Sequence, residues 1–528
     1  MKEKLVEEWL IRTRERGGID LALAQWLISQ GHEILWRGHS RTEFGKDIVS
    51  IAPDGEFHAF QTKDEDIDLT ELRRIRHQIN ELVEVPPVHP RIPHGSVHSP
   101  HLVTSGLIKE EVSFQIRAMN EGWATRGRPT LEIVGREGLI PRFVSMSDAF
   151  WPERPADIRD FFAFYLKDGL GDFDPKKFSA VLKGLLPLLN EPTKRKAQRL
   201  ASVGLLGNYL LHPFERERDH WSLFRGWTMI AAHQAWFAEK TGLPPPQWVP
   251  SFTLAKEAAQ ECLIELCSEC LAPNGFLPPE IEFNDYTRAR NLVLASALAV
   301  TDLNGLDAKV IGAESAQQRL ESLLSKKRLF CWGESAVPHL LGIQWYCEKW
   351  NLEIDAFPEL ESVIAELCER NHPRAEDVAF APPLLSADDV MAELFRSDPM
   401  QLPNRRAPGT WTLEALMEFF ARRNRREFLD RSWRKISRLD LLSFQPESTV
   451  DILIWECREG HESVRKSEMK QRWSALRNEA TGDRSETLPH ILQTDSNFGL
   501  MFLMTYPHRL SAALVRTLDT EHISKIGR

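Results

Sequence analysis

The segment from Gly31 to Lys63 constrains the fold of this chain most, because it reads as three short strands in a row. An Asp54-Gly55 pair separates the second and third strands, and both residue types tolerate the positive φ of a tight hairpin turn. The three runs are HEILW from residue 32, KDIVSIA from residue 46 and EFHAFQTK from residue 56. The segment therefore predicts a small β-sheet that contains at least one hairpin.

Polar side chains gather at the ends of these predicted strands. Side chains alternate across a strand, so Gln61 and Lys63 are expected on one face of the sheet and Thr62 on the other. Asp47 stands at the start of the preceding strand, and the hairpin would bring it near Gln61 and Lys63. An acid, an amide oxygen and an ammonium at one sheet edge can hold a divalent cation and position a water at a phosphodiester.

This pattern resembles the PD-(D/E)XK nuclease superfamily, in its restriction-endonuclease-like form with Q-x-K in place of E-x-K, as in the Mrr-type branch. The resemblance implies that Asp47 and Gln61 bind Mg²⁺ or Mn²⁺ and that Lys63 is catalytic. The family often adds an acidic residue on the helix before the first strand, which implies Asp20 as a further ligand, with Glu8 as the fallback. The similarity covers roughly the first quarter of the chain.

Two residues depart from the usual family pattern. Gln61 is neutral, so the site has one fewer charge to hold a cation, and Asp20 is shorter than the usual Glu. Mg²⁺ nevertheless prefers oxygen ligands and often uses only one or two carboxylates plus substrate phosphates. The alternative is a hairpin with solvated polar ends, but the joint pattern of acid, strand, turn and Q-x-K favours a site.

The rest of the first 148 residues predicts a mixed α/β domain. Helical periodicity covers residues 69–82 and 110–123, and strand-like runs cover 100–106 and 130–135. Strands that alternate with helices predict a mixed central sheet with flanking helices, typical of a restriction-endonuclease-like domain over residues 1–148. A chain of 528 residues should form more than one domain, since single cores seldom exceed about 300 residues.

From residue 149 to 528 helical periodicity replaces alternation, so a large all-α region is expected, with internal breaks near 272–280 and 398–410. Many of the sixteen tryptophans lie here and are expected to pack in its core. No apolar run of about 18 residues predicts a membrane span, and the charged start lacks the apolar stretch of a signal peptide. A cytoplasmic protein is expected.

The formal net charge of −10 argues against a free-standing, tight DNA binder. The basic stretch from Ala421 to Arg438 could still contact nucleic acid, because arginines grip phosphates and aromatic rings stack on bases. Its candidate residues are Arg422, Arg423, Arg425, Arg426, Trp433 and Arg434. The alternative is a solvated helix face, and the same choice holds for the shorter run from Thr193 to Arg199.

Two groups of potential metal ligands are expected to be structural. Cys267 and Cys270 form a lone C-x-x-C in a helical stretch near Cys262, and no second pair completes a zinc site. Seven cysteines in a chain of this length indicate a reducing compartment. The other group is a set of histidines in a Pro-rich stretch that predicts an exposed connector: His89, His94, His98 and His101.

The sequence thus favours a Mg²⁺-dependent endonuclease with a helical sensor, partner-docking or self-assembly region. Resemblance to restriction-type enzymes favours DNA over RNA as substrate, and gated cleavage suits bacterial defence against foreign DNA. A catalytically inactive scaffold or nucleic-acid-binding module, and an RNase, are the alternatives. No phosphate-binding P-loop, G-x-S-x-G or H-E-x-x-H motif supports another class of enzyme.

Overall fold

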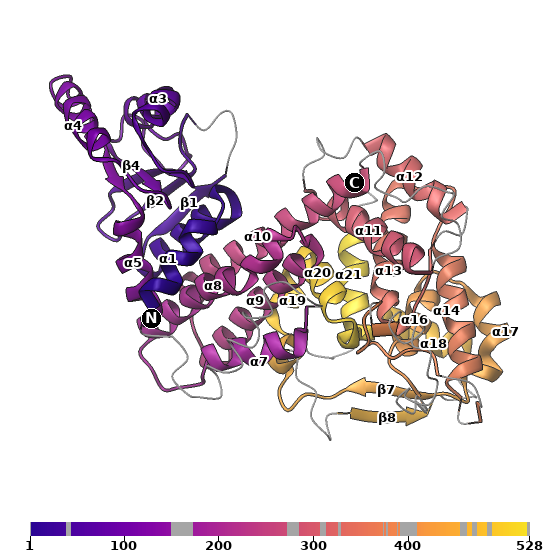
Figure 1. Ribbon diagram of the computed structural model, residues 1–528. Coiled ribbons are helices and arrows are strands. Elements are labelled where there is room, and N and C mark those ends of the chain that lie inside the picture. Colours follow the sequence, from indigo (N-terminus) through magenta and orange to yellow (C-terminus); the bar gives the residue numbers. More distant parts are fainter. Residues whose placement is uncertain are drawn as a thin grey trace. The chain divides into compact units, whose positions relative to one another are not determined.

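Figure 1 shows a computed structural model of the 528-residue chain, which divides into two compact units. The first unit comprises Met1–Asp219 with His233–Ala258, and the second comprises His220–Ala232 with Ala259–Arg528. The structure describes residues 2–38, 44–148, 173–271, 285–306, 313–325, 329–372, 374–375, 379–387, 389–390, 409–454, 462–466, 472–482 and 488–524. Residues 272–280 and most of 398–410, where breaks are predicted, lie outside these ranges.

The first unit contains a five-stranded mixed sheet in the order β1-β2-β3-β4-β5. Its strands are β1 Glu33–Arg37, β2 Ile48–Ile51, β3 Phe57–Lys63, β4 His98–Thr104 and β5 Glu132–Val134. The first three strands run antiparallel, and β4 and β5 continue the sheet in parallel with β3. Gly55, with φ +90°, closes the hairpin between β2 and β3 by donating its N–H to the Ala52 carbonyl. The mixed sheet and this hairpin are confirmed.

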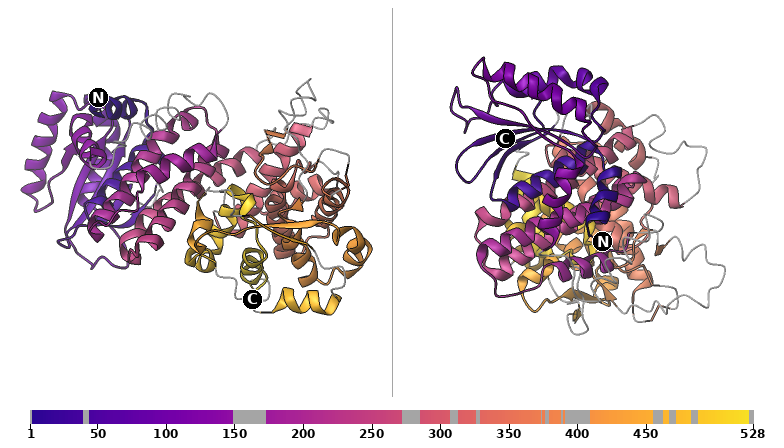
Figure 2. Two further views of the ribbon diagram at one scale, coloured as in Figure 1. Left: turned by 90° about the horizontal axis from the view of Figure 1, so that it is seen from below. Right: turned by 60° about the vertical axis from the view of Figure 1, so that its left-hand side comes forward.

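Helices lie on both faces of the sheet. They are α1 Lys2–Arg12, the helical turn η1 Glu15–Ile19, α2 Asp20–Ser29, α3 Leu69–Glu84, α4 Glu110–Ala124 and α5 Arg136–Asp148. The right-hand view of Figure 2 shows the purple helices α3 and α4 above the fanned strands and the indigo N-terminal helices below. The helices predicted over 69–82 and 110–123 are thereby confirmed.

The core under α3 and α4 explains why these sequences are helical. Apolar residues of α3, including Ile75 and Ile79, pack with Ala59 of β3 and Leu102 of β4. Each buried large aliphatic side chain contributes about 1.5–3 kcal/mol to stability. Asp68 caps α3, because its carboxylate accepts hydrogen bonds from the N–H groups of the first helical turn. Helix packing and capping therefore fix the end of β3 beside the start of α3.

Two further helices belong to the same unit as the sheet. They are α7 Pro175–Leu185 and α8 Thr193–Arg216. α8 packs closely on α2, because Gly204 has no side chain and a Cβ there would lie 2.5 Å from the Gln25 Cδ. The structure thus divides the chain elsewhere than at residue 148, and α8 becomes part of the scaffold around the sheet.

The described part of the second unit is mostly helical. Two helices, α9 His220–Thr241 and α10 Pro245–Leu271, contribute to both units. The helices and helical turns that follow are α11 Asp285–Leu303, α12 Ala313–Ser325, η2 Glu334–Ala336, α13 Val337–Trp350, α14 Phe357–Arg370, α16 Leu413–Arg422, α17 Arg426–Ile436, η4 Thr449–Leu453, α18 Trp473–Thr481, α19 His490–Thr494, α20 Ser496–Thr505, η5 Pro507–Arg509 and α21 Ala512–Ser524.

The prediction of an all-α region is wrong in one respect, because this unit also has a three-stranded sheet. Its strands are β6 Gly409–Thr410, β7 Asp440–Phe444 and β8 Glu462–Lys466. The strands are short and lie between segments with helical periodicity, so the sequence pattern does not reveal them. The buried side chains of Trp332 and Trp345 confirm core packing for these tryptophans. None of the described helices is long and apolar enough to cross a membrane.

Candidate active site

Asp47 lies immediately before β2, just after a point where the backbone passes close to α3 at Gly45. Gly45 has φ +70°, and a Cβ at this position would lie 2.4 Å from the carbonyl oxygen of Gln78 in α3. Only glycine fits both the conformation and the space. The neighbouring Lys46 is buried and donates to the Glu81 carbonyl of the same helix at 3.2 Å. Burial lowers the pKa of Lys46 to about 8.

The Asp47 carboxylate bridges two successive residues of β3. Its Oδ2 accepts hydrogen bonds from Gln61 Nε2 at 2.7 Å, Thr62 N at 2.6 Å and Thr62 Oγ1 at 2.9 Å. The expectation that Thr62 points away from Asp47 is wrong. Asp47 pairs with the strand through its own N–H to the Phe60 carbonyl, so its carboxylate reaches along the strand end and contacts both neighbouring side chains.

Lys63 contacts an acid that the sequence interpretation missed. Its Nζ lies 2.8 Å from Glu15 Oε1, and the Glu15 N–H donates to Asp64 Oδ2 at 3.1 Å. Glu15 comes from η1, the irregular turn before α2, and not from a regular helix. The sequence signal was an acidic residue four positions before Ile19, followed closely by Gly17-Gly18, which interrupts the helix.

Asp20 is placed differently from the expectation. Its Oδ2 accepts a hydrogen bond from Arg37 Nη1 at 2.8 Å, and both side chains are almost fully buried. A carboxylate that already binds a guanidinium is a poor ligand for Mg²⁺, so this contact does not support Asp20 in the site. Glu8, the fallback, is a half-exposed residue of α1 that lies 3.9 Å from Lys4.

Hard oxygen donors for a cation are present in this site, but they are few. Among the described residues, no three His, Cys, Asp or Glu side chains are grouped closely enough to hold a metal ion. Asp47 and Gln61 can contribute two ligands, because a half-turn of the Gln61 amide would put Oε1 where Nε2 now lies, 2.7 Å from Asp47 Oδ2. Adjacent oxygens around Mg²⁺ are about 3 Å apart, since its bonds are about 2.1 Å long. The pair therefore fits a cation that is completed by water and phosphate.

The proposed nucleic-acid residues at the end of α16 are engaged inside the protein. Arg422 Nε lies 2.8 Å from Asp519 Oδ2, and Arg423 contacts both Asp519 and Glu348, the latter at 2.5 Å. Arg423 also lies over the Phe419 ring, with its Cζ 3.5 Å from the ring centroid. These contacts do not support Arg422 and Arg423 as phosphate-binding residues, because their guanidinium groups bind these carboxylates.

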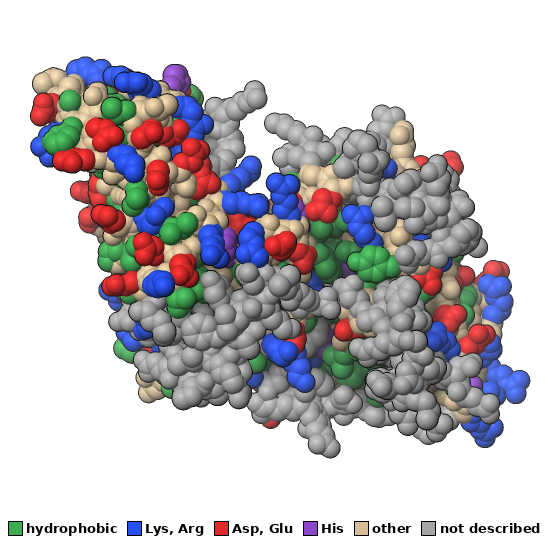
Figure 3. All heavy atoms as spheres, in the orientation of Figure 1, with side chains coloured by type: hydrophobic (Ala, Val, Ile, Leu, Met, Phe, Trp, Pro, Cys, Tyr) green, Lys and Arg blue, Asp and Glu red, His purple; other side chains and the backbone are tan. Residues whose placement is uncertain are grey.

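The rest of the basic stretch is exposed, and part of it is also paired. Arg425 lies 3.1 Å from Asp355 and Arg426 lies 2.9 Å from Asp430. Arg434 is exposed on α17 next to the half-buried Trp433. On the face in Figure 3, blue and red side chains are interspersed over the described residues and do not form one basic field. In the shorter run, Arg199 pairs with Glu191 at 2.6 Å.

The cysteines and histidines have structural surroundings. Burial raises the pKa of the Cys267 thiol to about 12, and its Sγ donates to Thr301 Oγ1 at 3.0 Å. Cys262 is also buried, so these two residues are confirmed as buried thiols. His98 and His101 lie on β4 and not in the connector, and the His98 Nε2 donates to the Leu82 carbonyl.

Three histidines that the sequence interpretation did not connect lie together on the sheet. His58 Nδ1 is 2.9 Å from His101 Nε2, and the His32 ring lies edge-on to His58 with centroids 5.2 Å apart. Burial and the neighbouring imidazoles lower the pKa of His32 to about 4 and also lower the pKa of His58. His101 Nδ1 lies 3.1 Å from Glu132, and this contact lowers the pKa of that carboxyl.

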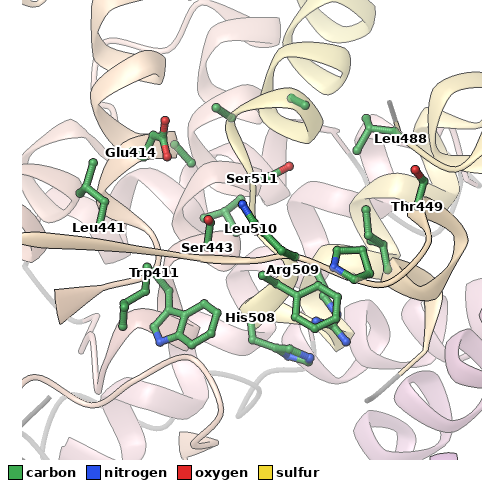
Figure 4. Close-up of a pocket in the computed structure, with 18 of the residues that line it drawn as sticks. Trp411, Glu414, Leu441, Ser443, Thr449, Leu488, His508, Arg509, Leu510 and Ser511 are labelled. Atoms are coloured by element: carbon green, nitrogen blue, oxygen red, sulfur yellow. The ribbon is translucent and has the colours of Figure 1, made fainter. Parts of the chain in front are cut away.

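A cavity of about 710 Å³ lies in the second unit (Figure 4). Trp411, Glu414 and Arg509 line it, together with strand β7 and the start of α21. Arg509 is buried, stacks on the Phe444 ring at 3.3 Å from the centroid, and donates to the Ile454 carbonyl. The lining mixes acidic, basic, aromatic and apolar groups, so it indicates no single class of ligand.

The candidate site therefore rests on residues from the β2–β3 hairpin and from η1. Asp47, Gln61 and Thr62 share hydrogen bonds, and Lys63 meets Glu15 at the next position along β3. This arrangement offers oxygen ligands and an ammonium within one strand end. Comparisons of the chain with protein-family models, with curated proteins and with solved structures found no match.

Proposed function

We propose that this protein is a metal-dependent endonuclease that hydrolyses DNA phosphodiester bonds. The observation that carries the proposal is the contact of Asp47 with the strand end that also bears Gln61 and Lys63. The mixed sheet with flanking helices supports it, because the resemblance to restriction-endonuclease-like nucleases implies a domain of this kind.

Asp47 and Gln61 would hold a Mg²⁺ or Mn²⁺ ion, with water and a substrate phosphate as the other ligands. Such an ion, when bound, lowers the pKa of a coordinated water and stabilises negative charge on the phosphoryl oxygens. Thr62 keeps the Asp47 carboxylate in place through two hydrogen bonds to the same oxygen, one from its N–H and one from its hydroxyl. This positioning fixes the carboxylate before the substrate arrives.

Lys63 supplies the positive charge that faces the scissile phosphate. Its ammonium can donate to a phosphoryl oxygen or to the attacking water. In this structure the ammonium binds the Glu15 carboxylate, which occupies one of its three donor positions. A phosphate oxygen can bind at the same donor position in place of Glu15, since it is also an anionic acceptor.

The mostly helical second unit would gate cleavage or recruit a protein partner. The net charge of −10 supports gating, because an acidic protein has little non-specific affinity for DNA. Resemblance to restriction-type enzymes favours DNA as the substrate and defence against foreign DNA as the role. The ion pairs of Arg422 and Arg423 do not support a part for these two residues in binding DNA.

The test is cleavage of supercoiled plasmid, linear DNA and structured RNA with and without Mg²⁺ or Mn²⁺. Asp47→Asn and Lys63→Met keep the size of each side chain, and each is expected to reduce the cleavage rate by about 10²–10³-fold. Lys4→Ala, an exposed change on α1, is the matched control and should cleave at the wild-type rate. Equal cleavage by wild type and both site variants would remove the proposal.

An inactive nuclease fold that serves as a scaffold is the second candidate. The observation that favours it is the direct Gln61 Nε2 to Asp47 Oδ2 hydrogen bond, in which the amide nitrogen and not the oxygen faces the carboxylate. Under this reading wild type cuts neither DNA nor RNA with any divalent ion. Mg²⁺ binding measured by titration calorimetry separates the two, because Asp47→Asn should abolish it only if the site holds a cation.

A further inference from the structure

The residues of the candidate site are closed off from solvent. Asp47 is 5% exposed, Gln61 4%, Thr62 0% and Lys63 7%. A phosphodiester is a large, charged group that keeps its hydration until it contacts the protein. It can reach Lys63 only if the segment that covers this side chain moves.

The segment in contact with Lys63 is η1, Glu15–Ile19, which we call the strap. Two contacts tie the strap to the end of β3: the Lys63–Glu15 ion pair at 2.8 Å and the hydrogen bond from the Glu15 N–H to Asp64 at 3.1 Å. Both contacts involve a single residue of the strap. A phosphate that binds Lys63 competes directly with the first of them.

The strap is held from its other side by α8. Asn208 Nδ2 donates to the Gly18 carbonyl at 3.1 Å, and Arg14 Nη2, just before the strap, donates to the Glu215 carbonyl at 3.2 Å. These contacts flank Glu15 in the sequence. α8 therefore contacts both ends of the turn that places Glu15 on Lys63, and it also packs on α2, which directly follows the strap.

The backbone of the strap is not a regular helix. Arg16 is extended, with φ −87° and ψ 128°, and Gly17 has φ +75°. A left-handed residue costs little only when it is glycine, so the turn depends on Gly17. Two non-helical residues between α1 and α2 allow the strap to change its path while both helices remain intact.

We propose that the strap is an autoinhibitory cover over Lys63 and that α8 holds it closed. Glu15 occupies the anion position on the Lys63 ammonium, and loosening of the Asn208 and Arg14 contacts frees that position for a substrate phosphate. Because α8 ends at Arg216, shortly before the chain first passes into the second unit at His220, it is suited to transmit a signal to the site. The regulatory part of this proposal rests on the proposed nuclease function.

The experiment uses the full chain with Arg14→Ala and Asn208→Ala combined. Loss of two hydrogen bonds of about 1 kcal/mol each should accelerate opening of the strap by roughly tenfold or more. Amide hydrogen exchange in peptides that cover residues 13–20 should quicken by about that factor. Acetylation of Lys63 by an amine reagent, read by mass spectrometry, should quicken in parallel, and neither measurement requires nuclease activity.

The matched control combines Arg12→Ala with Gln198→Ala. Arg12 is the exposed last residue of α1, and Gln198 lies on α8 but contacts the Ser29 carbonyl and not the strap. Exchange at residues 13–20 and labelling of Lys63 should stay at the wild-type rate in this control. Gly17→Ala, which strains the turn without a clash, should open the strap as the anchor variant does.

Cleavage then separates this proposal from the proposed function. If the anchor variant shows faster exchange, faster Lys63 labelling and about tenfold faster DNA cleavage, the strap is an inhibitory cover. If hydrogen exchange and Lys63 labelling are unchanged in the anchor variant, the proposal of an inhibitory strap is wrong, whatever the cleavage activity of the variant. Faster labelling with cleavage that is unchanged or slower than wild type also overturns it, since Glu15 would then assist catalysis. If no protein cuts DNA or RNA but labelling responds, the nuclease function fails and the cover stands.

Discussion

Asp47 in the sheet unit and Asp519 in the mostly helical unit are both buried carboxylates, but their partners differ. On β3, Asp47 Oδ2 accepts hydrogen bonds from neutral groups, the Gln61 amide and the N–H and hydroxyl of Thr62. Asp519 lies against two guanidinium groups and the Trp345 N–H. The first arrangement fixes a carboxylate at the end of a strand through donors of that strand, and the second places a carboxylate against two cations.

Neutral donors alone do not make a site. Glu334 is also buried, and its Oε2 accepts four hydrogen bonds of 2.8 Å from the backbone and hydroxyls of residues 410–412. Burial raises the pKa of Glu334, and the carboxyl ties η2 to the short strand β6. Asp47 differs because a lysine follows its partners on the same strand. In the sheet unit, Asp20 with Arg37 follows the pattern of Asp519, so it is structural in this view.

The largest expected effect is at Asp519. Asp519→Asn leaves Arg422 and Arg423 beside a neutral amide in a buried place, which should lower the free energy of unfolding by about 3–5 kcal/mol. Denaturant unfolding followed by tryptophan fluorescence measures it. Asp355→Asn, which removes the partner of the half-exposed Arg425, is the control and should cost less than about 1 kcal/mol. Equal losses of unfolding free energy in Asp519→Asn and Asp355→Asn would contradict the view that Asp519 neutralises buried arginines.

A medium effect is expected from the histidines of the sheet. The pKa of His32 is lowered to about 4, so between pH 6.5 and 4 the unfolded chain binds more protons than the folded one. Stability is therefore lost as the pH falls through this window. Between pH 7 and 5 the free energy of unfolding of His32→Gln should fall by about 1 kcal/mol less than that of wild type. This figure allows for the partial exposure of the ring. Unfolding midpoints at the two pH values measure it.

The control for the pH effect is His94→Gln, because His94 is exposed in the connector before β4. It should follow the wild-type pH dependence, since carboxylates that titrate in both proteins contribute equally to the slope. If the stability of His32→Gln falls as steeply as that of wild type, the pKa of His32 is not lowered in the folded protein.

Much of the sheet unit could be predicted from sequence because its signals are local. Asp54-Gly55 fixes a hairpin, and the hairpin register then determines that Asp47 meets the strand end that bears Gln61 and Lys63. The amphipathic helix α3 and its Asp68 cap can likewise be predicted from residues that are consecutive in the sequence. Within the hairpin, the predicted orientation of Thr62 is wrong, because Asp47 lies at a strand end, where alternation no longer decides which side chain it reaches.

The errors arise where partners are distant in sequence. Arg423 looks like one member of a basic run, but its partners Glu348 and Asp519 lie 75 and 96 residues away. Glu15 reaches Lys63 only because a broken helix turns back over the sheet, and Asp20 has the regular helical position but faces Arg37. Residue type and spacing cannot distinguish these cases, since the tertiary fold chooses the partner.

The smallest effect is expected at Arg434, an exposed residue of α17 outside the two buried ion pairs. If the mostly helical unit uses its arginines internally, Arg434→Ala should change neither stability beyond about 0.5 kcal/mol nor DNA binding beyond about twofold. Binding of labelled duplex at two salt concentrations tests this, with Arg426→Ala, whose partner is Asp430, as the matched variant. A large loss of affinity and a shallower salt dependence in Arg434→Ala alone would mean that α17 contacts phosphates, and the contrast between the two units would then hold only for its buried residues.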